Sequence, residues 1–133
     1  MSAERGTYLD ASAIVKLAVS EAESAALRHY LRRRRPLVSS ALAITEVGRA
    51  LFPLGAAAVH RGEDVLARVD LVRVSDRLLE DAARLPPADL RSLDAIHLAT
   101  AQQLGAGLAR VVCYDERMSA AARALGWTVV APS

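Results

Sequence analysis

The segment that decides the fold of this chain is Thr7-Tyr8-Leu9-Asp10-Ala11-Ser12-Ala13-Ile14-Val15-Lys16-Leu17. Its first residues are typical of a short β-strand, and from Ala11 onward the apolar residues recur at helical spacing. Asp10 therefore lies where a strand ends and a helix begins, which is the edge at which open α/β sheets bind their ligands. A carboxylate enclosed at that edge is costly to bury unless something positive lies opposite it. We therefore expect Asp10 to belong to a functional site.

The rest of the chain alternates short apolar runs with helical patterns. The predicted strands that follow the first one are 37–39, 71–74, 110–114 and 127–130. The predicted helices are 11–20, 21–35, 41–51, 64–69, 76–85, 92–103 and 116–125. We expect the helices that begin near 41, 76 and 92 to be capped by Ser39 or Ser40, Asp76 and Ser92. This alternation predicts an α/β fold with a mostly parallel sheet and helices on both faces.

Size and composition indicate one domain over residues 1–133, long enough for a single core. The residues are 53% hydrophobic but only 4% aromatic, which favours close-packed helices. The single cysteine, Cys113, excludes a disulfide framework and fits a reducing cytoplasm. Glu46 and Arg49 interrupt the most apolar region, and the first residues lack the apolar core of a signal peptide. We therefore expect a cytoplasmic protein that does not enter a membrane.

The basic residues are almost all arginine, and four of them form the run Arg32-Arg33-Arg34-Arg35. The formal net charge of +2 says little by itself, because 17 basic residues nearly balance 15 acidic ones. The run is explained equally well by codon bias combined with a solvated helix end. The alternative is a patch that contacts RNA phosphates, since arginine binds phosphate through two parallel hydrogen bonds. Composition leaves both interpretations open.

Four acidic residues stand apart from the others, which fall on polar helix faces or in turns: Asp10, Glu46, Asp94 and Asp115. Asp115, like Asp10, directly follows an apolar strand, and Glu46 and Asp94 lie within apolar helical turns. Each has a simpler explanation alone, which is helix capping for Asp94 and Asp115 and an ion pair with Arg49 for Glu46. Accepting the simpler explanation for every one of these acids requires four separate coincidences. We therefore predict that the four carboxylates form one site.

Clustered carboxylates repel one another unless a cation neutralises them, and ligand sets made only of oxygen select Mg²⁺ or Mn²⁺ over zinc. The three histidines, His29, His60 and His97, show no zinc-ligand spacing, and we interpret His97 as a packed helix residue rather than a catalytic base. Neither a Walker loop nor a G-x-G-x-x-G motif is present. This disfavours nucleotide hydrolysis, so metal-assisted hydrolysis of a nucleic acid is the better fit.

The chain resembles the PIN-domain family, and specifically toxins of the VapC type. The resemblance rests on four stretches in family order: 8–17, Thr45-Glu46-Val47, 93–101 (Leu93-Asp94-Ala95-Ile96-His97-Leu98-Ala99-Thr100-Ala101), and Tyr114-Asp115-Glu116-Arg117-Met118. It implies a five-stranded parallel sheet and Mg²⁺-dependent endoribonuclease activity. It also implies metal-binding roles for Asp10, Glu46, Asp94 and Asp115, and a supporting hydrogen bond from Ser12.

The same resemblance implies a homodimer and a cognate antitoxin whose tail blocks the acidic site, often through a basic side chain. The apolar stretch from Phe52 to Val59 is then explained either by core packing or by a partner surface. One position departs from the family pattern, because Cys113 stands where Thr or Ser is common. A thiol is a weaker hydrogen-bond donor than a hydroxyl, so a supporting role at this position is in doubt.

Two other functions compete with a ribonuclease. One is a catalytically silent PIN-like module that binds RNA or a protein, which the presence of all four acids disfavours. The other is a phosphohydrolase or receiver domain of similar topology. A phosphatase of the haloacid-dehalogenase type requires a second aspartate two residues after the first, and Ser12 occupies that position.

Overall fold

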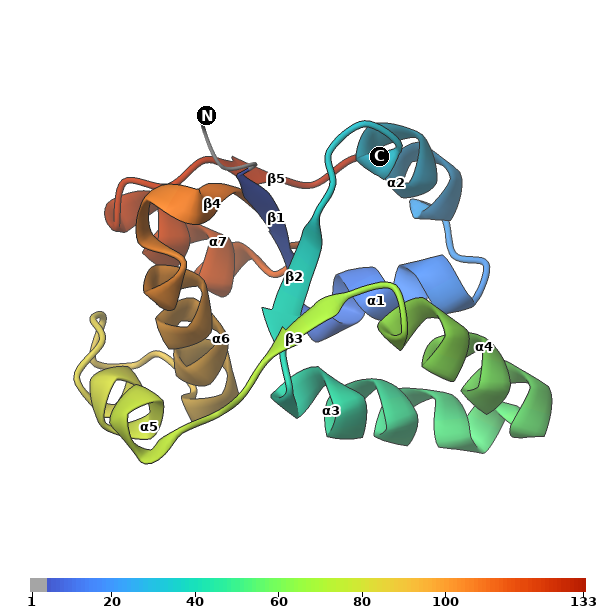
Figure 1. Ribbon diagram of the computed structural model, residues 1–133, viewed down its shortest axis with the longest axis horizontal. Helices are drawn as coiled ribbons and strands as arrows, with labels where there is room; N and C mark the ends of the chain where they lie inside the picture. The colour runs from blue at the N-terminus through green and yellow to red at the C-terminus, as the bar shows by residue number, and fades with distance from the viewer. Residues whose placement is uncertain (1–4) are drawn as a thin grey trace.

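The fold is centred on a parallel five-stranded sheet, described by a computed structural model that covers residues 5–133. The strands are β1 (Gly6–Leu9), β2 (Leu37–Ser40), β3 (Asp70–Val72), β4 (Leu108–Val112) and β5 (Val129–Val130), in the order β3-β2-β1-β4-β5 (Figure 1). β1 is therefore the central strand, and all of its residues are buried. The predicted α/β fold with a mostly parallel sheet is confirmed.

Helices cover both faces of this sheet (Figure 1). The α-helices of the described residues are α1 (Ala11–Ala18), α2 (Ser24–Leu31), α3 (Leu42–Leu51), α4 (Ala56–Leu66), α5 (Asp76–Ala83), α6 (Ser92–Gln103) and α7 (Glu116–Ala124). Short 3₁₀ turns follow α3 (η1, Phe52–Leu54) and α6 (η2, Gly105–Gly107). Within residues 5–133, no helix is long and apolar enough to cross a membrane.

Neighbouring residues of β1 serve two different cores, because successive side chains of a strand point to opposite faces. Leu9 packs with buried residues of α1, α2, α3 and α4. Tyr8 packs instead with Leu98 of α6 and Met118 of α7. A third, smaller core joins α5 to α6 around Leu78. The central strand thus ties together the two helical layers that carry the site residues.

Several element ends differ from the sequence prediction. The second helix spans Ser24–Leu31 rather than 21–35, because Ser24 Oγ accepts the amide hydrogen of Glu21 and Arg34 Nη1 donates to the Tyr30 carbonyl oxygen. β3 ends at Val72 rather than at residue 74, and β4 spans Leu108–Val112 rather than 110–114.

All three of the expected helix caps need correction. Ser75 rather than Asp76 caps α5, since its Oγ accepts the amide hydrogen of Leu78. Arg91 precedes α6, so Ser92 is the first helical residue and not a cap. Ala41 rather than Ser39 or Ser40 is the N-cap of α3, although Ser40 Oγ, one residue earlier, accepts the amide hydrogen of Leu42. Such errors of one residue arise because neighbouring polar residues compete for the same exposed amides.

Helices α3 and α4 approach each other closely at Gly62. A Cβ atom at this position would lie 2.4 Å from Leu51 Cδ1 and 3.3 Å from Val47 Cγ1. Both neighbours are buried on α3, so they have little room to move. Gly62 therefore sets the spacing of this helix pair.

Candidate active site

Two of the four predicted acids follow adjacent strands at the carboxyl edge of the sheet. Asp10 follows β1 and caps α1, where its Oδ1 accepts the amide hydrogen of Ala13 at 2.9 Å. Asp115 lies beyond β4 and caps α7, where its Oδ1 accepts the amide hydrogen of Met118 at 2.8 Å. The capping explanation for Asp115 is therefore correct, but it does not exclude a role in the site. Helix N-termini favour nearby negative charge, so both caps hold their carboxylates in place.

The other two acids come from helices on opposite sides of β1. Glu46 lies on α3 and Asp94 lies in the first turn of α6. These two side chains and Asp115 line a hollow of about 280 Å³, together with Arg91, Ser92 and Leu93. Asp10, which is 6% exposed, does not line this hollow. The structure thus brings three of the acids to one hollow and leaves Asp10 buried close by.

The charges of these acids affect one another. The pKa of Asp94 is raised, mainly by its partial burial and then by the negative charge of Asp115, with a smaller contribution from Asp10. The Arg91 guanidinium opposes this rise. Burial also raises the pKa of Asp10, against the opposing effect of hydrogen bonds from the Ala13 amide and the Ser12 hydroxyl. The site therefore carries negative charge that nearby cationic side chains only partly offset.

Glu46 is hydrogen-bonded to His97, whereas its simpler explanation had assumed an ion pair with Arg49. His97 Nε2 lies 2.6 Å from Glu46 Oε1, whereas the Arg49 guanidinium lies over the Phe52 ring at 5.9 Å from its centroid. His97 is only 2% exposed, so it is a packed helix residue as predicted. It nevertheless reaches the site, which sequence spacing did not reveal.

Ser12 and Cys113 lie directly beside the acids. Ser12 Oγ donates to Asp10 Oδ1 at 2.8 Å, and Cys113 Sγ donates to the Asp115 carbonyl oxygen at 3.5 Å. Burial, followed by the nearby Asp10 charge, raises the pKa of the Cys113 thiol to about 12. The thiol therefore stays protonated at neutral pH, and it remains a donor where the family often has a hydroxyl.

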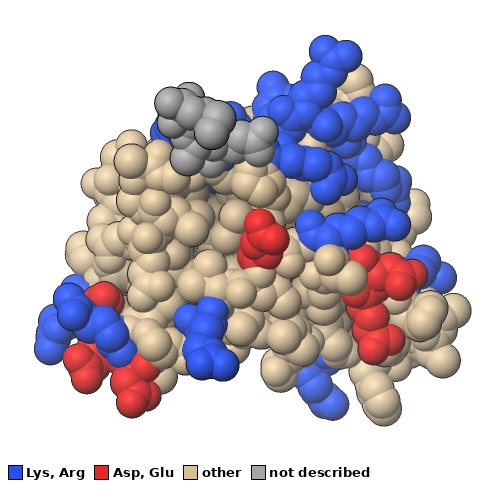
Figure 2. Space-filling view, in the orientation of Figure 1, with Lys and Arg blue, Asp and Glu red and all other residues tan. Residues whose placement is uncertain are grey.

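The arginine run lies at the other edge of the sheet. It precedes β2, whose first residue Leu37 pairs with Thr7, so it sits at the amino edge while the acids sit at the carboxyl edge. Arg32 and Arg35 line a second hollow of about 280 Å³ with Arg28 and Arg68. Figure 2 shows this concentration of basic side chains over the region of α2. The run is therefore separated from the acidic hollow by the length of the sheet.

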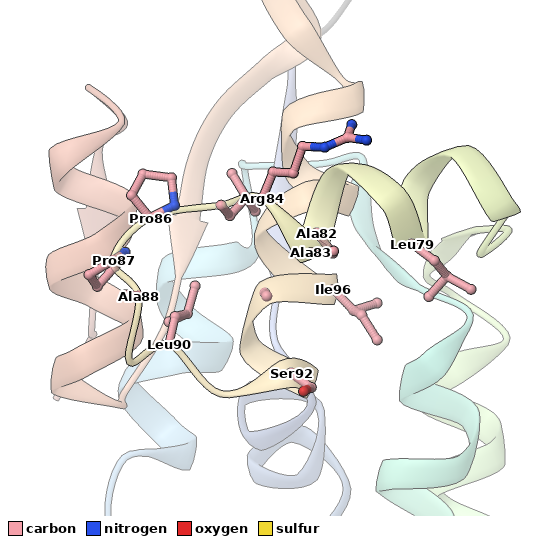
Figure 3. A pocket seen from close by; sticks show the side chains of 12 residues that line it. Leu79, Ala82, Ala83, Arg84, Pro86, Pro87, Ala88, Leu90, Ser92 and Ile96 are labelled. Atoms are coloured by element: carbon pink, nitrogen blue, oxygen red, sulfur yellow. The ribbon is translucent and has the colours of Figure 1, made fainter.

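Another hollow, of about 710 Å³, lies between α5, α6 and the loop that joins them. Leu79 and Ile96 face it from the two helices, and Pro86 and Pro87 border it on the loop (Figure 3). Ser92 lines both this hollow and the acidic one, so the two adjoin at the start of α6.

The donor set fits a hard divalent cation. Within the part of the chain that the structure describes, no three Asp, Glu, His or Cys side chains converge closely enough to form a closed metal cage. Mg²⁺ does not require such a cage, since it keeps several waters and binds through one or two carboxylates and substrate phosphate. The mutual repulsion of Asp94 and Asp115 is what such a cation would relieve.

Comparison with known proteins agrees with this fold. The family model for the PIN domain matches residues 7–124. Ribonuclease VapC46 of Mycobacterium tuberculosis is 60% identical over 126 residues, which cover 95% of this chain and 97% of that protein. Ribonuclease VapC35 of the same species is 44% identical, covering 94% and 96% of the two chains.

A solved structure shares the architecture. The crystal structure of Mycobacterium tuberculosis VapC20, described as a sarcin-ricin loop cleaving toxin, has a TM-score of 0.73 and 21% sequence identity, and the match covers 95% of this chain and 99% of that one. The chain therefore belongs to the PIN-domain family, among the VapC proteins.

Two residues near the acids were not predicted from sequence to belong to the site. Arg91 lines the acidic hollow, and His97 contacts Glu46. Arg91 had a usable signal, because it lies three residues before Asp94 at the start of the same helix. His97 had none, since its contact joins α6 to α3 across a long separation in sequence.

Proposed function

We propose that this protein is a Mg²⁺-dependent endoribonuclease and the toxin of a type II toxin–antitoxin pair. The observation that carries the proposal is the shared hollow of Glu46, Asp94 and Asp115, with the buried Asp10 beside it. Membership of the PIN-domain family and the similarity to VapC ribonucleases support it. The protein then acts in the cytoplasm, where its RNA substrate is found.

In this proposal Asp10, Glu46, Asp94 and Asp115 hold Mg²⁺, for which Mn²⁺ can substitute. When bound, the ion lowers the pKa of a water and stabilises charge on the phosphate oxygens. The Ala13 amide and the Ser12 hydroxyl favour the ionised form of Asp10 in spite of its burial. Arg91 offers the hollow a guanidinium that can pair with a phosphate oxygen of the substrate.

The arginine run has a separate role in the proposal. Arg32, Arg33, Arg34 and Arg35 contact RNA phosphates away from the bond that is cut, since they lie at the opposite edge of the sheet. Arg34 is the least available of them, because its guanidinium stacks on the Tyr30 ring at 3.9 Å and donates to the Tyr30 carbonyl. These contacts add affinity without choosing a cleavage site.

Two protein partners complete the proposal. One is a second copy of this chain, and the other is a cognate antitoxin whose basic side chain enters the acidic hollow. Phe52 and Leu54, which are 69% and 61% exposed, supply an apolar surface for one of these contacts. If Leu54→Asp leaves both the solution mass and antitoxin binding unchanged, Leu54 lies in neither interface.

Cleavage of RNA by purified protein tests the function. We expect cleavage of total bacterial RNA in Mg²⁺, none in EDTA, and loss of cleavage by orders of magnitude in Asp94→Asn, since metal ligands act as a unit. The matched control is Asp64→Asn, an exposed position on α4 that should keep full activity. Sequencing the new RNA ends identifies the substrate. RNA binding without cleavage in Mg²⁺ would instead support the silent binding module.

A further inference from the structure

A buried chain of hydrogen bonds runs from the central strand to the acidic hollow. The Tyr8 hydroxyl oxygen lies 2.7 Å from His97 Nδ1, and His97 Nε2 lies 2.6 Å from Glu46 Oε1. The rings of Tyr8 and His97 also meet edge to face, with centroids 5.9 Å apart and an interplanar angle of 74°. These two hydrogen bonds therefore connect β1, α6 and α3 through the imidazole ring of His97.

The hydrogen bonds fix which ring nitrogen carries the hydrogen. An ionised carboxylate only accepts, so Nε2 must donate to Glu46. In the neutral ring, Nδ1 is then the acceptor, and the Tyr8 hydroxyl is its donor. Without that hydroxyl, the hydrogen could move to Nδ1, and Nε2 would then present a lone pair to the Glu46 carboxylate. Tyr8 thus favours the tautomer that can bind Glu46.

His97 differs from an ordinary buried histidine because its hydrogen-bond partner Glu46 reaches the acidic hollow. Tyr8 is fully buried and the His97 side chain is 3% exposed, but the Glu46 side chain is 22% exposed and lines the acidic hollow. Glutamate has a long side chain that loses rotamer freedom when it is held in place. His97 engages Oε1 of Glu46, which leaves Oε2 for a ligand in the hollow.

We propose that Tyr8 and His97 are positioning residues that hold Glu46 in the orientation required for binding a divalent cation. The inference rests on the proposed function only in taking Glu46 as a metal ligand, and it concerns binding rather than cleavage. Groups that orient metal ligands from behind commonly change metal affinity by 10–100-fold when they are removed. Tyr8 is the sharper probe, because it touches His97 and not Glu46.

Metal binding to the whole protein tests the inference without relying on activity. We expect Tyr8→Phe to weaken Mn²⁺ binding by about 10-fold in calorimetry, with a larger loss in His97→Phe. His97→Gln should recover part of the affinity, because its amide can donate to Glu46. In the metal-free wild-type protein, ¹⁵N NMR should show the hydrogen of His97 on Nε2, and Tyr8→Phe should show a mixture of tautomers.

The control for lost stability is Thr7→Val, which removes another buried hydroxyl of β1 that donates to the Arg34 carbonyl at the amino edge. It should lower the melting temperature without changing Mn²⁺ affinity. Equal Mn²⁺ affinity in folded Tyr8→Phe, His97→Phe and wild type overturns the inference. Wild-type protein that binds Mn²⁺ but cleaves no RNA overturns the ribonuclease function and leaves the inference intact. If wild-type protein binds no metal, both fail.

Discussion

Asp10 and Asp115 both lie beyond the carboxyl ends of the adjacent strands β1 and β4, and the side chain of each accepts the amide hydrogen of the residue three positions later. Each carboxylate therefore has two uses. It caps the following helix, which any good hydrogen-bond acceptor could do, and it carries a charge at the site, which only an acid could supply. Substitutions that separate the two uses show which of them the protein requires.

Asp115→Asn and Asp115→Ala make this separation. The amide oxygen of asparagine can still accept the Met118 amide hydrogen, so Asp115→Asn should unfold at nearly the wild-type urea concentration in EDTA. Asp115→Ala loses the cap and should be less stable by about 1 kcal/mol. Both should lose RNA cleavage by orders of magnitude. Substantial activity in Asp115→Asn would show that Asp115 acts only as a helix cap.

Repulsion between Asp94 and the neighbouring acids should lower the melting temperature of the metal-free protein. Its pKa is raised in the folded protein, so its ionised form opposes folding at neutral pH. Metal-free Asp94→Asn should therefore melt at a higher temperature than wild type at pH 7. The difference should fade as the pH falls through the raised pKa of Asp94 and below its value in the unfolded chain, because the carboxyl is then neutral in both states.

Added Mg²⁺ should reverse the order of the two melting temperatures, so that wild type melts above Asp94→Asn. Wild-type protein should gain melting temperature at millimolar Mg²⁺, while Asp94→Asn should gain less, because binding to the folded state alone stabilises it. Asp64→Asn serves as the control and should follow the wild type in both conditions. An identical response of wild type and Asp94→Asn to Mg²⁺ would exclude Asp94 from the metal site.

The sequence was sufficient to predict the architecture, because alternating strand and helix signals leave few other arrangements. It also predicted that Asp10, Glu46, Asp94 and Asp115 would form one site, since their surroundings make each acid unusual. Glu46, Asp94 and Asp115 do line one hollow, whereas Asp10 is buried beside it. It did not reveal the Glu46–His97 pair, the Arg91 contribution to the hollow, or the placement of the arginine run at the opposite edge. The Glu46–His97 contact and the placement of the arginine run depend on contacts between distant segments, which local periodicity does not encode. Arg91 had a local signal that was not used, since it lies three residues before Asp94.

Arg32 and Arg35 should affect RNA affinity without affecting metal binding. Replacing both with glutamine removes two charges from the basic hollow and should weaken RNA binding most at low salt. The slope of log affinity against log salt concentration should become shallower by about 1.4 units for single-stranded RNA, since each lost phosphate contact changes it by about 0.7. The control is Arg123→Gln, an exposed position on α7. An unchanged slope in the double variant would favour a solvated helix end over an RNA contact.

Gly62 and Gly48 should respond in opposite directions to alanine. Alanine at Gly62 would overpack the contact with Leu51 and should destabilise the fold by about 1–3 kcal/mol. A Cβ atom at Gly48 meets nothing within 4 Å, so Gly48→Ala should stabilise α3 by about 0.5–1 kcal/mol through helix propensity. Urea unfolding measures both. Equal stabilisation by the two substitutions would contradict the close approach of α3 and α4.

Arginines lie at one edge of the sheet and carboxylates at the other, so the charge distribution of the molecule is asymmetric. An approaching polyanion is attracted to the arginine edge and repelled from the carboxylate edge, so it first meets the edge opposite the proposed site. A divalent cation at the acids would offset part of this negative charge and so weaken the repulsion. If the acids hold the ion as proposed, the ion also eases the approach of RNA to the site, and metal-free protein should bind RNA mainly at the arginine edge.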